Sequence, residues 1–211
     1  MFPCLKLSKL QELLEGISGF EKPKLLLEQY ITPPHLGSHM LHIVQAHYGD
    51  ITGKIIADLG CGCGGLSVGV ALLNAGLVVG FEIDGEALDI FRVNVSEFEL
   101  VNIDAIQCDV LNISDRFFKK FDTVLMNPPF GTKCNIGLDM KFLEVAFQLS
   151  TRSVYSLHKT STRKHVLKHA ASLGAKAEVL AELRYDLPST YKFHKKTSVD
   201  INVDFYRFLI S

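Results

Sequence analysis

A glycine-rich loop between an apolar run and an amphipathic stretch constrains the fold of this 211-residue chain more than any other feature. The run at 54–59 is dominated by β-branched and apolar residues and predicts a buried parallel strand. The loop at 60–65 follows, and residues 66–74 have the pattern of a helix. Such a strand–loop–helix unit presents free backbone N–H groups that can approach a ligand closely.

The same alternation of strands and helices continues along the chain. After the first unit, strands are predicted at 77–83, 104–108, 121–126 and 153–157, helices at 85–98, 139–150 and 163–173, and a short helix or turn at 116–120. Helices at 5–15, 22–30 and 35–48 precede the core, and 175–184 with 199–209 predict an antiparallel pair. The expected fold is an α/β, doubly wound, mostly parallel seven-stranded sheet with an antiparallel C-terminal edge. We expect one domain over 1–211, with a helical extension at 1–50 and a Rossmann-like core at 51–211.

Composition limits the class of protein. Hydrophobic residues make up 47% and charged residues 21%, as in ordinary globular chains. We expect no membrane span, because no apolar run reaches about 18 residues, and no secretion, because the N-terminus lacks a signal sequence. The odd number of cysteines favours a reduced, intracellular protein. We expect no metal site, because the C-x-C of Cys61 and Cys63 has no second Cys/His pair at zinc-ligand spacing.

The glycine loop favours one class of cofactor. Its spacing is G-x-G-x-G, whereas dinucleotide enzymes use G-x-G-x-x-G, and an acid, Asp58, directly precedes it. An acid here would repel a pyrophosphate but suits the cationic ammonium group of S-adenosylmethionine. Gly60, Cys61 and Gly62 are therefore expected to lie beside such a cofactor.

Acidic residues also follow the next two strands. Glu82 or Asp84 can bind the ribose hydroxyls; Glu82 is favoured because it lies nearer the strand end, and Asp84 suits a helix N-cap. Asp109, with Val110 after it, can accept a hydrogen bond from the adenine amino group. Any one acid could be a cap, but acids after three successive strands favour a cofactor site that also includes Ile83.

The motif Asn127-Pro128-Pro129-Phe130 follows the strand at 121–126 and predicts the catalytic loop. An amino or amide nitrogen is a poor nucleophile because its lone pair is delocalised. The Asn127 side-chain oxygen and the Pro128 carbonyl can accept its two hydrogens. Two prolines stiffen the loop, and Phe130 offers a stacking face worth about 1–3 kcal/mol to a base.

Charge is unevenly distributed along the chain. Residues 1–150 carry 11 Lys and Arg against 18 Asp and Glu, whereas residues 151–211 carry 11 against 5. A solvated surface is the usual explanation of such a run, but here we favour RNA, with phosphates contacting a surface that includes His158. Its other members are expected to be Lys159, Arg163, Lys164, His165, Lys168, Lys192, His194, Lys195 and Lys196.

Several stretches together resemble a known family, the methyltransferase-like protein five family of eukaryotic 18S rRNA adenine-N6 methyltransferases. They are FEKPKLLLEQY, ADLGCGCG, VGFEID, FDTVLMNPPFGTK, VYSLHK and AELRYDLPSTYKFHKK. The resemblance implies a class I S-adenosylmethionine-dependent methyltransferase fold and the catalytic and cofactor residues above. It also implies that Gln29 and Thr32 close over the cofactor, although a helix end at a proline stop explains that stretch equally well. Where the family carries Asp at the ribose position, this chain has Glu82, which is expected to preserve chelation.

The resemblance further implies partners: 18S rRNA or a small-subunit precursor, and a small zinc-binding activator protein that forms a heterodimer. The predicted strand 104–108 is expected to be an unpaired sheet edge, which suits strand addition by another chain. The nucleus, including the nucleolus, and the cytoplasm are the expected compartments. Two alternatives stay open: a protein glutamine-N5 methyltransferase, and a catalytically silent RNA-binding or assembly factor on the same fold.

Overall fold

A computed structural model describes residues 5–131, 135–188 and 198–210, without the side chains of 186–188 and 198–200. Four residues that are expected to contact RNA lie outside the described residues: Lys192, His194, Lys195 and Lys196. Its helices are α1 (Leu7–Glu15), α2 (Pro34–Tyr48), α3 (Gly65–Leu72), α4 (Gly85–Glu97), α5 (Leu138–Leu149) and α6 (Arg163–Ser172). Its strands are β1 (Ile55–Leu59), β2 (Leu77–Glu82), β3 (Ile103–Gln107), β4 (Phe121–Met126), β5 (Ser150–Lys159), β6 (Lys176–Pro188) and β7 (Ser198–Leu209).

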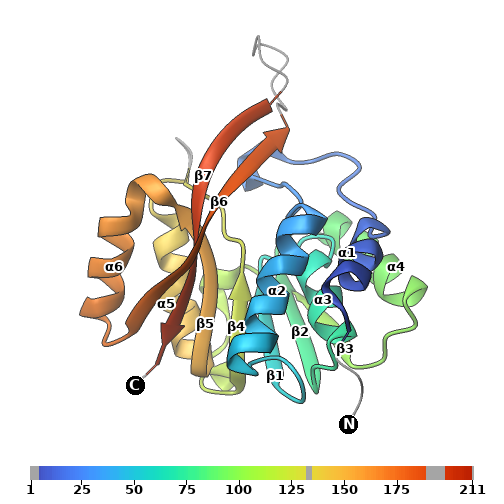
Figure 1. Cartoon of the computed structure of the whole chain (residues 1–211), viewed down its shortest axis with the longest axis horizontal. Helices are drawn as coiled ribbons and strands as arrows, with labels where there is room; N and C mark the ends of the chain where they lie inside the picture. The colour runs from blue at the N-terminus through green and yellow to red at the C-terminus, as the bar shows by residue number, and fades with distance from the viewer. Residues whose placement is uncertain (1–4, 132–134, 189–197, 211) are drawn as a thin grey trace.

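The strands form one sheet in the order β3-β2-β1-β4-β5-β7-β6, in which β7 runs antiparallel to β5 and to β6 (Figure 1). The predicted doubly wound sheet, its antiparallel C-terminal edge and the edge position of the strand near 104–108 are confirmed. The order reverses between β1 and β4, and the carboxyl ends of those two strands are where open α/β sheets bind ligands.

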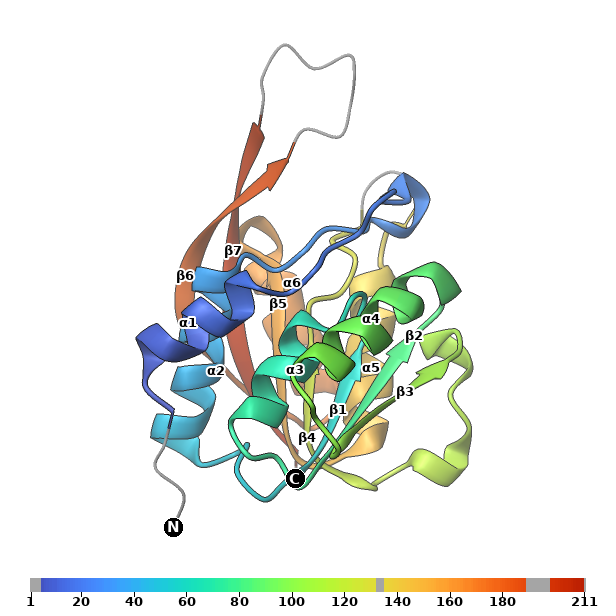
Figure 2. The ribbon, with the colours of Figure 1, turned by 90° about the vertical axis from the view of Figure 1, so that its right-hand side faces the viewer.

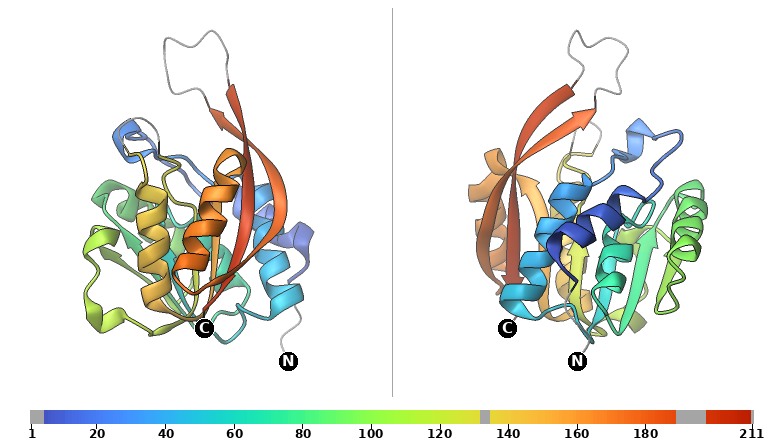
Figure 3. Two further views of the ribbon diagram at one scale, coloured as in Figure 1. Left: turned by 90° about the vertical axis from the view of Figure 1, so that its left-hand side faces the viewer. Right: turned by 45° about the vertical axis from the view of Figure 1, so that its right-hand side comes forward.

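Helices cover both faces of the sheet. Figure 3 shows α5 and α6 on one face and α1 to α4 on the other. The alternation of side chains along β1 explains this, because Ile56 packs into the cluster under α1 to α3 and Ala57 into the cluster under α5. None of the helices in the described part of the chain is long and apolar enough to cross a lipid bilayer.

The helix predicted at 22–30 is wrong, whereas the short helix or turn predicted at 116–120 is confirmed as a 3₁₀ turn with slightly different bounds. The helix expected at 22–30 is only a 3₁₀ turn at Leu25–Leu27, which ends where Glu28 adopts a left-handed conformation with φ +51°. Leu26 is 74% exposed, so this apolar run has no core to pack against. The helix or turn expected at 116–120 is a 3₁₀ turn at Asp115–Phe117; two further 3₁₀ turns lie at Val110–Asn112 and Thr160–Thr162.

The segment that joins α1 to α2 runs along the carboxyl ends of the parallel strands (Figure 2). We call residues 17–32 the cover segment. It is held to the core by hydrogen bonds from Ser18 N to Asn94 Oδ1 (2.9 Å) and from Asn135 Nδ2 to the carbonyl of Leu26 (3.0 Å). These bonds place it over the glycine loop and the NPPF loop.

Candidate active site

The glycine loop after β1 forms one wall of a cavity at the sheet's switch point. Gly60, Gly62 and Gly64 have φ values of +71°, +54° and +92°, which favour glycine. A Cβ on Gly62 would lie 2.9 Å from the ring of Phe20 in the cover segment, and one on Gly64 would lie 2.7 Å from the ring of Phe91. The loop is therefore closely packed on both sides, and the cavity is lined by backbone at Gly60, Cys61 and Gly62.

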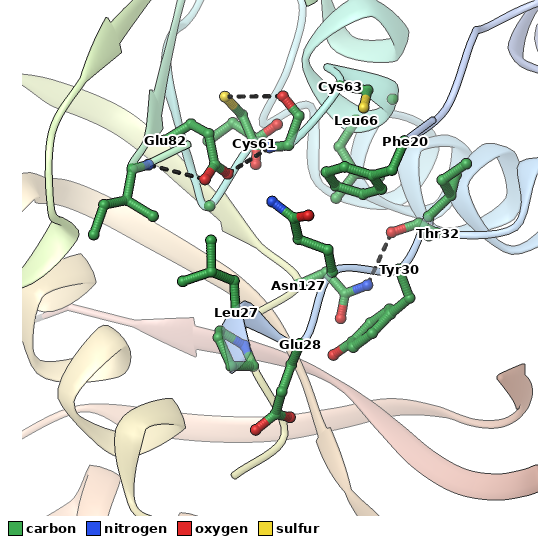
Figure 4. A pocket seen from close by; sticks show the side chains of 18 of the residues that line it. Phe20, Leu27, Glu28, Tyr30, Thr32, Cys61, Cys63, Leu66, Glu82 and Asn127 are labelled. Carbon is green, nitrogen blue, oxygen red and sulfur yellow. Dashed lines mark hydrogen bonds between the residues drawn. The ribbon is translucent and has the colours of Figure 1, made fainter. Parts of the chain in front are cut away.

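Of the two acids at the carboxyl end of β2, Glu82 lines the cavity (Figure 4). Its carboxylate accepts hydrogen bonds of 2.9 Å each from the backbone N–H groups of Gly62, Ile83 and Asp84. Burial raises the pKa of Glu82, and these three donors oppose the rise. The bonds hold its oxygens at the strand end with lone pairs left over, which suits a diol ligand.

Asp84 caps a helix and binds the cover segment. Its carboxylate caps α4 by accepting from Glu86 N at 3.1 Å, which confirms its prediction as the N-cap. It also accepts from Lys24 Nζ (2.7 Å) and Gln29 Nε2 (2.6 Å) of the cover segment. Burial alone would raise the pKa of Asp84, but the hydrogen bonds from Lys24 and Gln29 lower it. Gln29 lines the cavity while its amide N–H is committed to Asp84.

The remaining predicted cofactor residues also line the cavity. Asp58 is 1% exposed and accepts a 2.6 Å hydrogen bond from the Ser67 hydroxyl. Asp109 accepts from Leu111 N at 2.9 Å at the start of its 3₁₀ turn, and Ile83 and Val110 lie beside it in the wall. The structure thus brings together residues from β1, β2, the loop after β3, and the cover segment.

The NPPF loop lies next to this cavity at the end of β4. Asn127 Nδ2 donates to Thr32 Oγ1 at 2.9 Å (Figure 4). It also donates to the Tyr185 hydroxyl at 3.2 Å. Since the Tyr185 hydroxyl gives its own proton to the Ile31 carbonyl at 2.9 Å, its oxygen must accept, and this fixes the orientation of the amide. Asn127 Oδ1 is buried and has no hydrogen-bond partner among the described residues. A buried acceptor left unpaired in this way is costly unless a ligand supplies the donor.

The comparisons with known proteins agree with this geometry. The family model for the methyltransferase small domain matches residues 36–152. The rRNA N(6)-adenosine-methyltransferase METTL5 of Danio rerio is 61% identical over 97% of this chain and 99% of its own. The Drosophila melanogaster protein Mettl5, also named rRNA N(6)-adenosine-methyltransferase, is 59% identical over 98% of this chain and 97% of its own. The crystal structure of the Pyrococcus horikoshii protein PH1948 has a TM-score of 0.87 and 36% identity, covering 98% of each chain.

The chain belongs to the METTL5 methyltransferase family. It is an enzyme with the Rossmann-like class I methyltransferase fold, and the resemblance found in its sequence motifs is confirmed.

Several residues of this METTL5-family site were not predicted from the sequence. Tyr30 stacks on the predicted Phe130 with ring centroids 5.4 Å apart and planes at 18°, and Tyr185 meets both rings edge-on. Tyr30 also donates its hydroxyl to the Pro128 carbonyl at 3.0 Å. Phe20, Leu138 and Phe142 add apolar surface to the cavity. No local spacing indicates these residues, because each is brought to the site by tertiary packing.

Phe130 is less accessible than the prediction of a stacking face requires. Its side chain is only 6% exposed, because the ring of Tyr30 covers it. The face that was predicted to receive the target ring is therefore occupied by a side chain of the same protein.

The predicted RNA-contacting residues separate into distinct environments. Lys164 is exposed and Lys159 is half-buried. The Arg163 guanidinium binds Asp204 through two hydrogen bonds of 2.7 Å and Glu182 at 2.7 Å, so its charge is compensated within the protein. The prediction that His158 lies on this surface is wrong. His158 is 0% exposed in β5, an interior strand of the sheet, where it contacts Ser156 and Asp139.

The cysteines of the glycine loop have no reactive character. Cys61 and Cys63 are both buried, and burial raises the pKa of each thiol, that of Cys63 to about 12. Within the described ranges, no group of three or more His, Cys, Asp or Glu side chains is arranged to hold a metal ion. The C-x-C serves as small side chains in a tight loop.

Tyr185 is a positioning residue for Asn127, and its removal should slow catalysis. We expect Tyr185→Phe to lower kcat by roughly fivefold, because one hydrogen bond of about 1 kcal/mol that orients the amide is lost. Cofactor affinity, measured by calorimetry, should stay unchanged. Tyr206→Phe is the matched control. It removes a buried hydroxyl that donates to Asp204 (3.0 Å) and lies outside the site. Equal kcat losses in the two variants would contradict the positioning role.

Proposed function

We propose that this protein transfers a methyl group from S-adenosylmethionine to the N6 amino group of an adenosine in small-subunit (18S) rRNA. The observation that carries the proposal is the buried Asn127 Oδ1 beside the cavity, which no donor among the described residues reaches. The names of the relatives above, rRNA N(6)-adenosine-methyltransferases, support the substrate class.

The residues of the cavity fit S-adenosylmethionine, which supplies an electrophilic methyl group on its sulfonium. Asp58 would bind the ammonium group, Glu82 the ribose hydroxyls, and Asp109 the adenine amino group. The fit rests on the donor set: Glu82 is held at the strand end by three N–H donors, and the glycine loop exposes backbone where side chains would collide. Gln29 and Thr32 hold the cover segment over this cavity.

The NPPF loop would bind the target amino group. Asn127 Oδ1 and the Pro128 carbonyl would accept the two hydrogens of the target amino group, which favours a tetrahedral nitrogen with a localised lone pair. Thr32 and Tyr185 hold the Asn127 amide so that its oxygen is the free acceptor. Such preorganised hydrogen bonds act without reorganisation during the reaction. Lys159, Lys164 and the basic residues that follow β6 would contact RNA phosphates.

The direct test is transfer of labelled methyl from S-adenosylmethionine to total RNA and to a cell protein extract, by wild type and by Asn127→Ala. Label in small-subunit rRNA as N6-methyladenosine, lost in the variant, is the expected result. Label in protein would instead favour a glutamine methyltransferase. Label in neither, with the cofactor still bound in calorimetry, would favour a silent RNA-binding factor.

A small zinc-binding activator protein is the proposed partner, and β3 is its proposed docking edge. The strand Ile103–Gln107 pairs with β2 on one side and ends the sheet on the other. Val101, at 97% exposed, and Val93, at 52%, give this side of the molecule apolar surface. We expect amide hydrogen exchange in residues 103–107 to slow when the activator is co-expressed, whereas the opposite edge strand β6 should be unaffected. Protection of β6 in place of β3 would contradict this docking edge.

We also propose that the protein acts in the nucleus, including the nucleolus, and in the cytoplasm, where small-subunit rRNA is made and used.

A further inference from the structure

Tyr30 makes two contacts that the proposed reaction assigns to the target base. Its ring stacks on Phe130 at 5.4 Å with planes at 18°, and its hydroxyl donates to the Pro128 carbonyl at 3.0 Å. Figure 4 shows Tyr30 beside Asn127 in the same cavity wall. An adenine held for methylation would need the same aromatic face and the same carbonyl oxygen.

We propose that Tyr30 occupies the target-base site in the RNA-free protein and that the incoming adenine displaces it. The inference rests on the proposed function, because it takes the NPPF loop as the acceptor of the target amino group. Tyr30 then serves as a stand-in for the base. It keeps the Pro128 carbonyl hydrogen-bonded and covers the face of Phe130, which is 6% exposed.

Insertion of the base between the two rings as they stand is excluded by their separation. Carbon atoms in contact lie about 3.5–4.0 Å apart, so a ring placed between two others needs about 7 Å between their planes. The Tyr30 and Phe130 centroids are 5.4 Å apart. Tyr30 must therefore move before a base can stack on Phe130.

The cover segment allows the side chain to move while its backbone stays in place. On one side of Tyr30, Gln29 is held by Asp84 at 2.6 Å. On the other side, the Ile31 carbonyl accepts from Tyr185 at 2.9 Å and Thr32 accepts from Asn127 at 2.9 Å. These anchors also hold Asn127 in its oriented state. Rotation of the Tyr30 side chain would thus open the base site without loosening the cofactor cavity or the Asn127 amide.

Displacement selects among nucleotides. A base that leaves its own stack regains the lost contacts only if it can stack on Phe130 and donate a hydrogen bond to the Pro128 carbonyl, as the Tyr30 ring and hydroxyl do. The binding-competent state is then a fraction of the free protein, and apparent RNA affinity is reduced by that fraction. A variant that weakens the closed state should bind substrate more tightly with unchanged chemistry.

Tyr30→Phe tests the inference, because it removes the hydroxyl and keeps the ring. In steady-state methylation of a small-subunit rRNA fragment, we expect the KM for RNA to fall by roughly fivefold, the factor that corresponds to about 1 kcal/mol. The value of kcat should not change. The control is Tyr48→Phe, whose hydroxyl lies 3.5 Å from Glu178 outside the site and whose ring keeps its contact with Arg207. A KM that is unchanged or raised in Tyr30→Phe would overturn the proposal, because Tyr30 would then aid base binding or be irrelevant to it.

A spectroscopic measurement follows the side chain itself. With 3-fluorotyrosine placed only at position 30, we expect the ¹⁹F resonance to shift when the same rRNA fragment is added, and to stay in place when the fragment lacks the methylated adenosine. If the ¹⁹F resonance does not shift in a protein that does methylate the fragment, the proposed displacement of Tyr30 is wrong while the proposed function stands. If wild type methylates no adenosine in rRNA, the proposed function fails first, so the two failures are distinguishable.

Discussion

Asn127→Ala should lower kcat for methyl transfer by about 10²- to 10³-fold, the usual cost of removing one preorganised acceptor or donor at a reacting centre. The Oδ1 atom of Asn127 is buried and, among the described residues, accepts no hydrogen bond, so the site is built for a donor that the protein does not supply. Cofactor affinity should change far less. Single-turnover kinetics with saturating rRNA, together with calorimetry of S-adenosylmethionine binding, measures the two effects separately.

Two further variants sharpen this result. Asn127→Asp keeps an acceptor oxygen for the target amino group, so it should retain more activity than the alanine variant. It should still be less active than wild type, because it loses the amide hydrogens donated to Thr32 and Tyr185. Asn102→Ala removes an amide bonded to the Ala75 carbonyl at 2.6 Å, remote from the cavity, and should leave kcat unchanged. A kcat for Asn127→Ala within tenfold of wild type would mean that the NPPF loop does not bind the reacting nitrogen.

The fold was predictable because its signals are local. The alternation of apolar runs and amphipathic stretches marks each strand and helix, and a right-handed β–α alternation leaves few arrangements of the sheet. The acids at the carboxyl ends of β1 and β2 and after β3 were predictable for the same reason, since the carboxyl ends of parallel strands meet at one edge. The sequence also predicts that Asp84, and not Glu82, caps α4, because Asp84 directly precedes the first residue of that helix.

Tertiary packing determines what could not be predicted. Tyr30 and Pro128 are bonded although 98 residues separate them, and Asn127 and Tyr185 are 58 residues apart. Nothing in either neighbourhood indicates these pairs. Tertiary contacts also explain why residues 22–30 do not form the predicted helix. The Lys24 side chain binds Asp84 at the start of α4, and the Leu26 carbonyl accepts from Asn135 in the loop before α5. The sequence predicts His158 on the surface because it belongs to a basic run, whereas the strand that carries it, β5, lies inside the sheet.

The affinity for S-adenosylmethionine should depend on pH through Asp58. Burial raises the pKa of Asp58 to about 7, the Ser67 hydroxyl opposes the rise, and the nearby Glu82 adds to it. A cationic ammonium group binds the ionised carboxylate, so below pH 7 the acid must first lose a proton. The affinity should therefore fall by up to about tenfold for each pH unit below 7 and level off above that value.

Calorimetry of cofactor binding between pH 5.5 and 7.5 measures this dependence, and two variants assign it. Asp58→Asn should bind weakly across the range and lose the steep part of the curve; any slope that stays belongs to Glu82, whose pKa burial also raises. Ser67→Ala removes a 2.6 Å hydrogen bond that favours the ionised form, so its transition should move to higher pH. An affinity for the wild type that is constant from pH 5.5 to 7.5 would show that Asp58 is already ionised in the free protein. The ammonium group would then be bound without the release of a proton from the chain.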